Sequence, residues 1–203
     1  MIAIIDYGVG NLFSLVSSFK SIGADAIITS DKDVIRNADR IILPGVGAFS
    51  DAAKKLHDSG MDRLVIELAR SGKPIMGICL GMQLLFEKSY EYGEHEGLGL
   101  LKGNVVPIEG AVPANLKIPH IGWNALHFRG SSRLFKYIKE GDCVYFVHSF
   151  YAADCDESVI ATSEYGIELT AAVQNGNVMG CQFHPEKSGA VGLNILRAFC
   201  EEN

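Results

Sequence analysis

Long hydrophobic runs are absent from this chain of 203 residues, whose longest apolar stretches have only the length of β-strands. A helix needs about 20 consecutive apolar residues to cross a bilayer, so the sequence predicts no transmembrane helix. The N-terminus also lacks the basic region and cleavage site of a signal peptide, because Met1 leads directly into the strand-like residues 2–5. We therefore expect a cytoplasmic protein.

Positive charge is scarce and is not clustered. The chain has 18 Lys and Arg residues against 24 Asp and Glu residues, which gives a formal net charge of −6. Nucleic acids and anionic membranes are bound through clusters of basic side chains. We therefore expect no nucleic acid and no membrane among the partners of this protein.

Cysteine is limited to five residues, and none of them has the paired spacing of metal ligands. An odd number fits reduced thiols better than a disulfide framework or a zinc site. The third glycine of a dinucleotide-binding loop is also missing, since Phe13 stands where it would follow Gly8-Val9-Gly10. The sequence thus predicts no metal and no cofactor, and these two glycines are interpreted as a tight turn.

Hydrophobic residues make up 48% of the chain, and no linker or repeat divides it, so residues 1–203 are expected to form one domain. In the first half, short apolar runs alternate with helical periodicity, which predicts an α/β fold with a mostly parallel sheet flanked by helices. In the second half, short strands and the turn signal Asn175-Gly176 predict additional antiparallel strands. Expected strands cover residues 2–5, 26–29, 40–43, 74–78, 104–108, 123–128, 143–150, 159–162, 169–174 and 178–183, and a loop covers 87–100. The first expected helix begins at residue 12 and is ended by Gly23. Further helices are expected at residues 31–36, 50–56, 61–70 and 189–200.

The segment Gly77-Ile78-Cys79-Leu80-Gly81 organises the chain, because it follows a strand-like run and leads into apolar residues with helical spacing up to Phe86. This is the pattern of a nucleophile elbow with Cys in place of Ser, in which the two glycines leave room for neighbouring backbone. A free thiol has a pKa of about 8.5, and a helix N-terminus favours its thiolate. We interpret Cys79 as a nucleophile, with an ordinary buried cysteine as the alternative.

A nucleophilic cysteine needs a base, and position distinguishes the six histidines of the chain. His184 ends a strand-like run, and Pro185 keeps the next step extended, so Glu186 is expected to face the same side and orient the imidazole. Cys79, His184 and Glu186 then form a triad of nucleophile, base and orienting carboxylate. His148, which ends another strand-like run, is the reserve candidate for the base.

A second glycine loop, Gly45-Val46-Gly47, follows the strand expected at residues 40–43. One interpretation is a simple turn. The other is an oxyanion strand, whose backbone amide near Val46 works with the amide of Leu80 on a developing negative oxygen.

Several separate motifs resemble the class I, or triad, glutamine amidotransferases over essentially the whole chain. The elbow through Gln83 and the segment Gln182-Phe183-His184-Pro185-Glu186-Lys187-Ser188 carry this resemblance. Other motifs are similar to the glutaminase subunits of imidazole glycerol phosphate synthase, including Pro44-Gly45-Val46-Gly47, where other class I members usually have Pro-Gly-Gly. The remaining motifs of this kind are Asp6-Tyr7-Gly8-Val9-Gly10-Asn11, Pro119-His120-Ile121-Gly122-Trp123-Asn124 and Tyr145-Phe146-Val147-His148-Ser149.

The resemblance implies a flavodoxin-like class I amidotransferase fold and hydrolysis of glutamine to glutamate and ammonia through a thioester on Cys79. Gln83 is then a candidate substrate contact, against the alternative of a partly exposed helix residue, and the resemblance adds backbone contacts from Ser149 and Phe150. It also favours the oxyanion interpretation of the glycine loop.

The resemblance further implies a partner, a (β/α)8-barrel cyclase subunit of imidazole glycerol phosphate synthase, which receives the ammonia through a tunnel. Together the two subunits make imidazole glycerol phosphate and aminoimidazole carboxamide ribotide in histidine biosynthesis. We hypothesise that the free subunit is nearly inactive until the partner reorients the Val46 amide. The residues expected to border the heterodimer interface are Asn11, His120, Trp123, Tyr145 and Lys187.

Three other functions stay open at this stage. A paralogous glutaminase subunit feeds ammonia to a different synthase, for example one that amidates a sugar. A stand-alone Cys hydrolase of flavodoxin-like fold shares the elbow, although Gln83 and the ending around His184 argue against it. A non-catalytic interaction subunit keeps the fold, although the intact triad argues against that.

Overall fold

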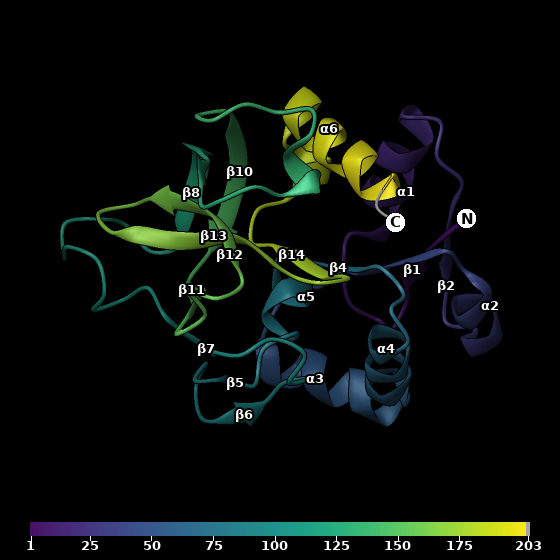
Figure 1. Ribbon diagram of the computed structural model, residues 1–203. Helices are drawn as coiled ribbons and strands as arrows, with labels where there is room; N and C mark the ends of the chain where they lie inside the picture. Colours follow the sequence, from purple (N-terminus) through teal and green to yellow (C-terminus); the bar gives the residue numbers. More distant parts are fainter. Residues whose placement is uncertain (202–203) are drawn as a thin grey trace.

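The computed structural model describes residues 1–201, in which a large sheet runs through the middle of the molecule with helices above and below it (Figure 1). The sheet has eight strands in the order β2-β1-β3-β4-β14-β13-β12-β9. Neighbours from β2 to β14 pair in parallel, and β13, β12 and β9 continue the sheet in antiparallel fashion. In sheet order the bounds are β2 (Ala26–Thr29), β1 (Ile2–Ile5), β3 (Arg40–Leu43), β4 (Ile75–Ile78), β14 (Val178–Cys181), β13 (Glu168–Asn175), β12 (Val159–Glu164) and β9 (His127–Phe128).

Two layers of helices cover the parallel part of the sheet. Helices α1 (Leu12–Ser21) and α6 (Gly189–Cys200) lie on one face, and α2 (Lys32–Asn37), α3 (Phe49–Asp58) and α4 (Met61–Arg70) lie on the other. In β1, Ile2 and Ile4 pack into the core on the side of α1 and α6. Ala3 and Ile5 pack into the core on the side of α2, α3 and α4. Because successive side chains of a strand point to opposite faces, a strand covered on both sides is apolar throughout.

The predicted α/β architecture is confirmed, together with several details from both halves of the chain. The observed α4 and α6 have the bounds expected for residues 61–70 and 189–200. Asp31 caps α2, because its carboxylate accepts hydrogen bonds from the amides of Asp33 (2.9 Å) and Val34 (3.3 Å). Gly176 has φ +57° and joins β13 to β14 at the predicted turn.

The strand predicted at residues 143–150 is in fact two strands that belong to different sheets. β10 (Cys143–His148) pairs with β8 (His120–Ala125), and β11 (Phe150–Ala153) pairs with β7 (Asn104–Pro107). Ser149 is the single residue between them. The apolar pattern is continuous across this point, so it does not reveal that the hydrogen-bonding partner changes.

Other boundaries also differ from expectation where tertiary pairing decides them. The strand expected at residues 123–128 begins at His120 as β8 and breaks before the short β9. The loop expected at residues 87–100 contains β5 (Lys88–Ser89) and β6 (His95–Glu96), which join β7 and β11 in a four-stranded sheet.

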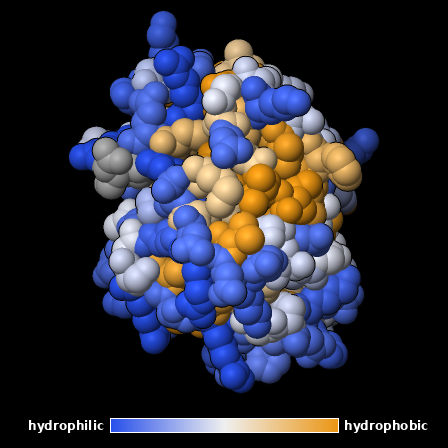
Figure 2. Space-filling view, turned by 90° about the vertical axis from the view of Figure 1, so that its right-hand side faces the viewer, coloured by the Kyte–Doolittle hydropathy of each residue, from blue (hydrophilic) through white to orange (hydrophobic). Residues whose placement is uncertain are grey.

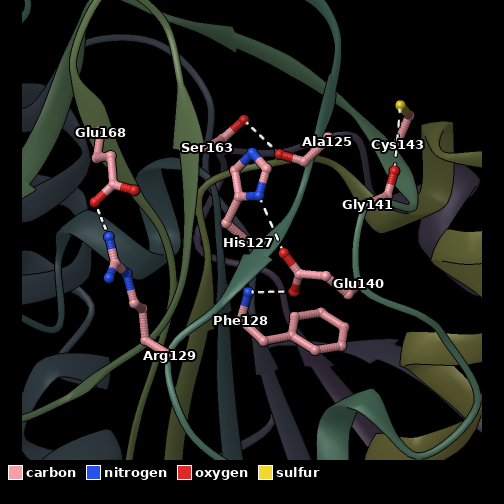
Figure 3. A network of polar contacts seen from close by, with 9 residues as sticks. All are labelled: Ala125, His127, Phe128, Arg129, Glu140, Gly141, Cys143, Ser163 and Glu168. Carbon is pink, nitrogen blue, oxygen red and sulfur yellow. Dashed lines mark hydrogen bonds and ion pairs between the residues drawn. The ribbon is translucent and has the colours of Figure 1, made fainter.

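Polar contacts hold β9 and its surroundings at one end of the large sheet (Figure 3). The Glu140 carboxylate accepts from the Phe128 amide at 2.7 Å and contacts His127 Nδ1 at 3.1 Å. The Ser163 hydroxyl on β12 donates to the Ala125 carbonyl on β8 at 2.9 Å. These bonds connect the two-stranded β8–β10 sheet to the large one, and therefore help to fix its position.

The opposite end of the sheet is the edge strand β2, whose four residues are all half-buried. Figure 2 shows the side of the molecule on which this edge lies, with a hydrophobic area surrounded by hydrophilic side chains. Within residues 1–201, none of the helices combines the length and the apolar character needed to cross a membrane.

Candidate active site

Cys79 lies where the central strand β4 ends and α5 (Leu80–Gln83) begins. Its amide donates to the Cys181 carbonyl of the neighbouring β14 at 2.8 Å, so the last ladder contact of the strand fixes its position. Its backbone has φ +54° and ψ −114°, a conformation that costs a non-glycine residue of order 1–3 kcal/mol. This strained turn is the predicted nucleophile elbow.

The two glycines of the elbow are required by close backbone approach, as expected. A Cβ atom on Gly77 would lie 2.6 Å from the Gly81 carbonyl oxygen, and one on Gly81 would lie 1.9 Å from the Leu43 carbonyl oxygen. The helix beyond the elbow is shorter than predicted, because α5 has only four residues and Leu85 turns back to bond the Met82 carbonyl. A single turn has few aligned peptide dipoles and gives the thiolate less support than a long helix.

His184 and Glu186 are joined by a hydrogen bond of 2.8 Å between Nδ1 and Oε1. Their side chains are almost fully buried, at 4% and 2% exposure. The backbone differs from the extended segment predicted, because Pro185–Lys187 form a 3-10 turn, η2, after His184. The carboxylate therefore reaches the imidazole across a turn, and the second ring nitrogen is left for the Cys79 thiol.

The pKa of His184 results from opposing effects. Burial acts to lower it, but the hydrogen bonds and charges of Cys79 and Glu186 outweigh burial and raise the pKa of His184 to about 9. The ring therefore holds a proton at neutral pH when it faces the thiolate. A charged imidazole between a sulfur nucleophile and a carboxylate is suited to general acid chemistry.

A cavity of about 360 Å³ opens beside Cys79 and is lined by residues from six separate segments of the chain. It brings together most of the residues predicted for the site and adds others that the sequence did not single out. The predicted lining residues are Val46, Gly47, Cys79, Leu80, Gln83, Ser149, Phe150, His184 and Lys187. The reserve base His148 also lines the cavity, and the additional residues are Glu91, Tyr92, Pro119 and Val147.

The predicted oxyanion loop lies against the elbow. Gly47 has φ +94°, and Val46 is 43% exposed at the cavity. Gly45 does not line the cavity; it packs so closely on the elbow that a Cβ there would lie 2.7 Å from the Gly81 amide nitrogen. The loop is thus held against the backbone that follows the nucleophile.

Tyr7 supports this loop through a hydrogen bond to the residue before it, and the sequence analysis gave Tyr7 no role. Its hydroxyl donates to the Pro44 carbonyl at 2.7 Å, and the side chain is buried. Burial raises the pKa of Tyr7, and the nearby Cys79 raises it further, so the phenol stays protonated and remains a donor. The motif that contains Tyr7 was visible, but its contact with Pro44 joins segments 37 residues apart.

Gln83 is buried and is not the partly exposed helix residue considered as an alternative. Its Nε2 donates to the Phe150 carbonyl (3.1 Å) and to Gln182 Oε1 (2.9 Å). Gln182, which the sequence did not single out, donates in turn to the Cys79 sulfur at 3.7 Å. The motif that carries the resemblance contains Gln182, but its contact with Cys79 joins segments 103 residues apart.

Of the five residues predicted for a partner interface, four are at least partly exposed and one is buried. Trp123 (55% exposed) and Tyr145 have ring centroids 6.0 Å apart, and the Lys187 ammonium lies 5.9 Å from the Tyr145 ring, so these three form one surface cluster. Asn11 is exposed at the start of α1. His120 does not fit the prediction, because its side chain is 1% exposed and is turned inward against His148.

The reserve base, His148, lines the cavity, but both of its ring nitrogens are engaged elsewhere. Nδ1 contacts the Phe150 carbonyl at 2.8 Å, and Nε2 contacts His120 Nδ1 at 3.0 Å. His184 is therefore the ring available to Cys79.

Comparisons with known proteins agree with this geometry. Residues 3–202 match the family model described as glutamine amidotransferase class-I. The chain is 49% identical over 203 residues to imidazole glycerol phosphate synthase subunit HisH of Wolinella succinogenes, covering 99% of both chains. It is 52% identical over 202 residues to the same subunit of Caldanaerobacter subterraneus subsp. tengcongensis, covering 99% of this chain and 98% of the relative.

Solved structures show the same fold at lower sequence identity. A crystal structure of a glutamine amidotransferase superposes with a TM-score of 0.77 at 20% identity, covering 99% of this chain and 98% of the other. PurLQS from Thermotoga maritima superposes with a TM-score of 0.73 at 21% identity, covering 98% and 97%.

The strain at Cys79 gives a stability prediction. Glycine adopts positive φ without steric cost, so Cys79→Gly is expected to be more stable to urea than Cys79→Ala by about 1 kcal/mol. The same pair of substitutions at the buried Cys181, which lies in a regular strand, should show the opposite order. Equal stability of the two Cys79 variants would contradict the strained elbow.

Proposed function

The chain belongs to the class I glutamine amidotransferase family, and from this premise we propose that it is the glutamine-hydrolysing subunit of an imidazole glycerol phosphate synthase. The observation that carries the proposal is the identity of about half of all residues, over the full length, to HisH subunits of that enzyme. The site supports it, because the cysteine, histidine and carboxylate needed for glutaminase chemistry meet beside one cavity.

The reaction begins with attack of the Cys79 sulfur on the side-chain carboxamide carbon of glutamine. The oxygen becomes negative as the C–S bond forms, and the amides of Leu80 and of the loop Gly45-Val46-Gly47 stabilise it. When the C–N bond breaks, His184 gives its proton to the leaving nitrogen, so ammonia departs and a thioester remains. His184 then takes a proton from water, whose oxygen attacks the thioester carbon. The C–S bond breaks, glutamate leaves, and the Cys79 thiolate is restored beside the protonated His184.

Gln83, Ser149 and Phe150 are proposed to hold the amino-acid end of glutamine. The ladder bond from the Ile108 amide to the Ser149 carbonyl (2.9 Å) leaves the N–H and C=O of Phe150 pointing away from β7. The Phe150 carbonyl faces Gln83 and His148, so its amide points to the same side, where the cavity lies. This arrangement supports backbone recognition of the substrate.

A cyclase subunit is the proposed acceptor of the ammonia, and a (β/α)8 barrel in a heterodimer is its expected form. Large apolar side chains are exposed around the cavity, as at an interface that a partner covers. Val46 lines the cavity, and Ile118 precedes the lining residue Pro119. Among the exposed apolar residues, Val46 and Tyr92 line the cavity, and Ile118, Ile121 and Trp123 lie in and just before β8.

The first test measures glutamate release from glutamine by the purified chain, alone and with a histidine-pathway cyclase and its ribotide substrate. We expect a low rate for the chain alone, strong stimulation by the loaded cyclase, and no activity for Cys79→Ala. Stimulation only by a different synthase would identify a paralogous subunit. Hydrolysis of peptides or esters without glutamine would instead indicate a stand-alone hydrolase, and a Cys79 that is inert to a glutamine-analogue electrophile would indicate a non-catalytic subunit.

The predicted partner interface is tested by alanine substitution at Asn11, Trp123 and Lys187. Buried aromatic residues dominate many interfaces, so Trp123→Ala is expected to weaken cyclase binding about tenfold or more, measured by titration calorimetry. Lys102→Ala is a matched control, because Lys102 is exposed and pairs only with the exposed Glu157 at 3.7 Å. Unchanged affinity and unchanged ligand-stimulated activity in all three variants would overturn the interface.

The pH dependence of the reaction follows from the raised pKa of His184. The general acid is present below the pKa, so kcat/KM for glutamine is expected to fall as the pH rises through about 9. Glu186→Gln removes a hydrogen-bonded charge that raises this pKa, and should move the basic limb to lower pH by about one unit or more. Glu140→Gln, which removes the carboxylate beside the surface His127, should leave the profile unchanged.

A further inference from the structure

A pair of histidines lies directly behind the substrate-binding segment. His120 on β8 and His148 on β10 are register partners, are 1% and 6% exposed, and contact each other through Nδ1 and Nε2 at 3.0 Å. The His120 ring also lies between aromatic rings, with its centroid 5.0 Å from that of Phe146 and 4.1 Å from that of Tyr165. The triad chemistry does not use this pair, so its burial needs another explanation.

The hydrogen-bond partners of His148 determine where its proton lies. The Phe150 carbonyl only accepts, so His148 Nδ1, at 2.8 Å, carries the hydrogen. Burial lowers the pKa of His148 to about 4 and lowers that of His120 as well, so each ring has a single N–H at neutral pH. His148 Nε2 is then an acceptor that faces His120 Nδ1.

The single N–H of a neutral His120 meets two acceptors. His148 Nε2 lies 3.0 Å from His120 Nδ1, and the Oδ1 atom of the half-buried Asn124 lies 2.9 Å from His120 Nε2. The bond from His148 Nδ1 to the Phe150 carbonyl is complete whichever of these two acceptors takes the His120 hydrogen.

The Phe150 carbonyl is the point at which the pair meets the substrate site. It accepts from His148 Nδ1 and also from Gln83 Nε2 at 3.1 Å, so both of its lone pairs are used. Gln83 continues to Gln182, and Gln182 to the Cys79 sulfur. A displacement of this carbonyl would therefore change both the substrate-binding amide of Phe150 and the side chain of Gln83.

We propose that His148, oriented by His120, is a positioning residue of the glutaminase, which fixes the Phe150 peptide in the orientation that binds the amino-acid end of glutamine. This inference rests on the proposed function, since it names a further residue for the same site. His120 lies on the inward face of β8. Its neighbours Ile121 and Trp123 are exposed, among the side chains proposed for the partner interface.

Two isosteric substitutions test the two ring nitrogens of His148 one at a time. The amide nitrogen of Asn occupies the place of Nδ1, so His148→Asn keeps the bond to Phe150 and loses the contact with His120. Gln reaches the place of Nε2, so His148→Gln keeps the contact with His120 and loses the bond to Phe150. We expect His148→Gln to raise the KM for glutamine about tenfold with a smaller change in kcat, and His148→Asn to stay within about threefold of the wild type.

The assays use the complex of the chain with its loaded cyclase, with the surface variant His127→Gln as the matched control. Alkylation of Cys79 by iodoacetamide, which does not need the amino-acid site, should proceed equally in all variants. Labelling by a glutamine-analogue electrophile, which does need it, should be slowed only in His148→Gln. A wild-type KM in His148→Gln, or equal defects in both His148 variants, would overturn the proposal.

A failure of the proposed function is distinguishable from a failure of this inference. If the wild type and His127→Gln release no glutamate, the function is wrong; if they are active and the His148 variants match them, only the positioning role is wrong. Should His148→Gln fail to fold, His120→Leu against His120→Asn takes its place. His120→Leu removes the polar contact with His148 Nε2 and should raise KM about threefold, whereas Asn retains that contact. Equal KM values in those two variants would overturn the proposal as well.

Discussion

The parallel pairing of β4 with β14 is the constraint on which the rest of the site depends. Cys181 pairs with Ile78, and both strands end at the same edge of the sheet. Cys79 is the next residue of one strand, and His184 follows the other by three positions. The backbone pairing of the two strands thus brings together two segments that are about a hundred residues apart in the sequence. Gly81 and Gly45 leave room where the elbow meets the end of β3, because Cβ atoms there would lie 1.9 Å from the Leu43 carbonyl oxygen and 2.7 Å from the Gly81 amide nitrogen.

Burial makes the ionic part of the site effective. Among the described residues, Glu186 Oε2 is buried without a hydrogen-bond partner, and only its other oxygen meets His184. A carboxylate held in this way has no other compensation for its charge, so it favours the protonated ring strongly. Removing a single partner from such a pair leaves an isolated buried charge, which is costly. The same low-polarity surroundings keep His148 neutral, so two histidines that line one cavity have opposite protonation at neutral pH.

Sequence reasoning succeeded where the determining interactions are local or repeat with a regular period. The strand runs, the cap at Asp31, the elbow and the association of His184 with Glu186 are of this kind. It failed where the outcome depends on which distant segment lies alongside. Tyr7 and Gln182 were missed because their partners come from other strands and loops. His120 was expected at the interface because its motif resembles that of the family, and the motif does not show that the ring turns inward against His148. The helix after Cys79 was expected to be longer, since apolar spacing cannot show that the residues after Gln83 turn back on themselves.

The change of sheet at Ser149 has a consequence for how this protein can vary. β10 and β11 are separated by one residue, and each is locked by its own antiparallel register, His148 against His120 and Phe150 against Pro107. An insertion or deletion at this point would shift one strand by a residue, and a shift of one residue exchanges the two faces of a strand. The aromatic surface of β10 would turn inward, or the Phe150 peptide would turn away from the cavity. An insertion or deletion at this junction is therefore expected to disrupt either the exposed surface of β10 or the substrate-binding segment.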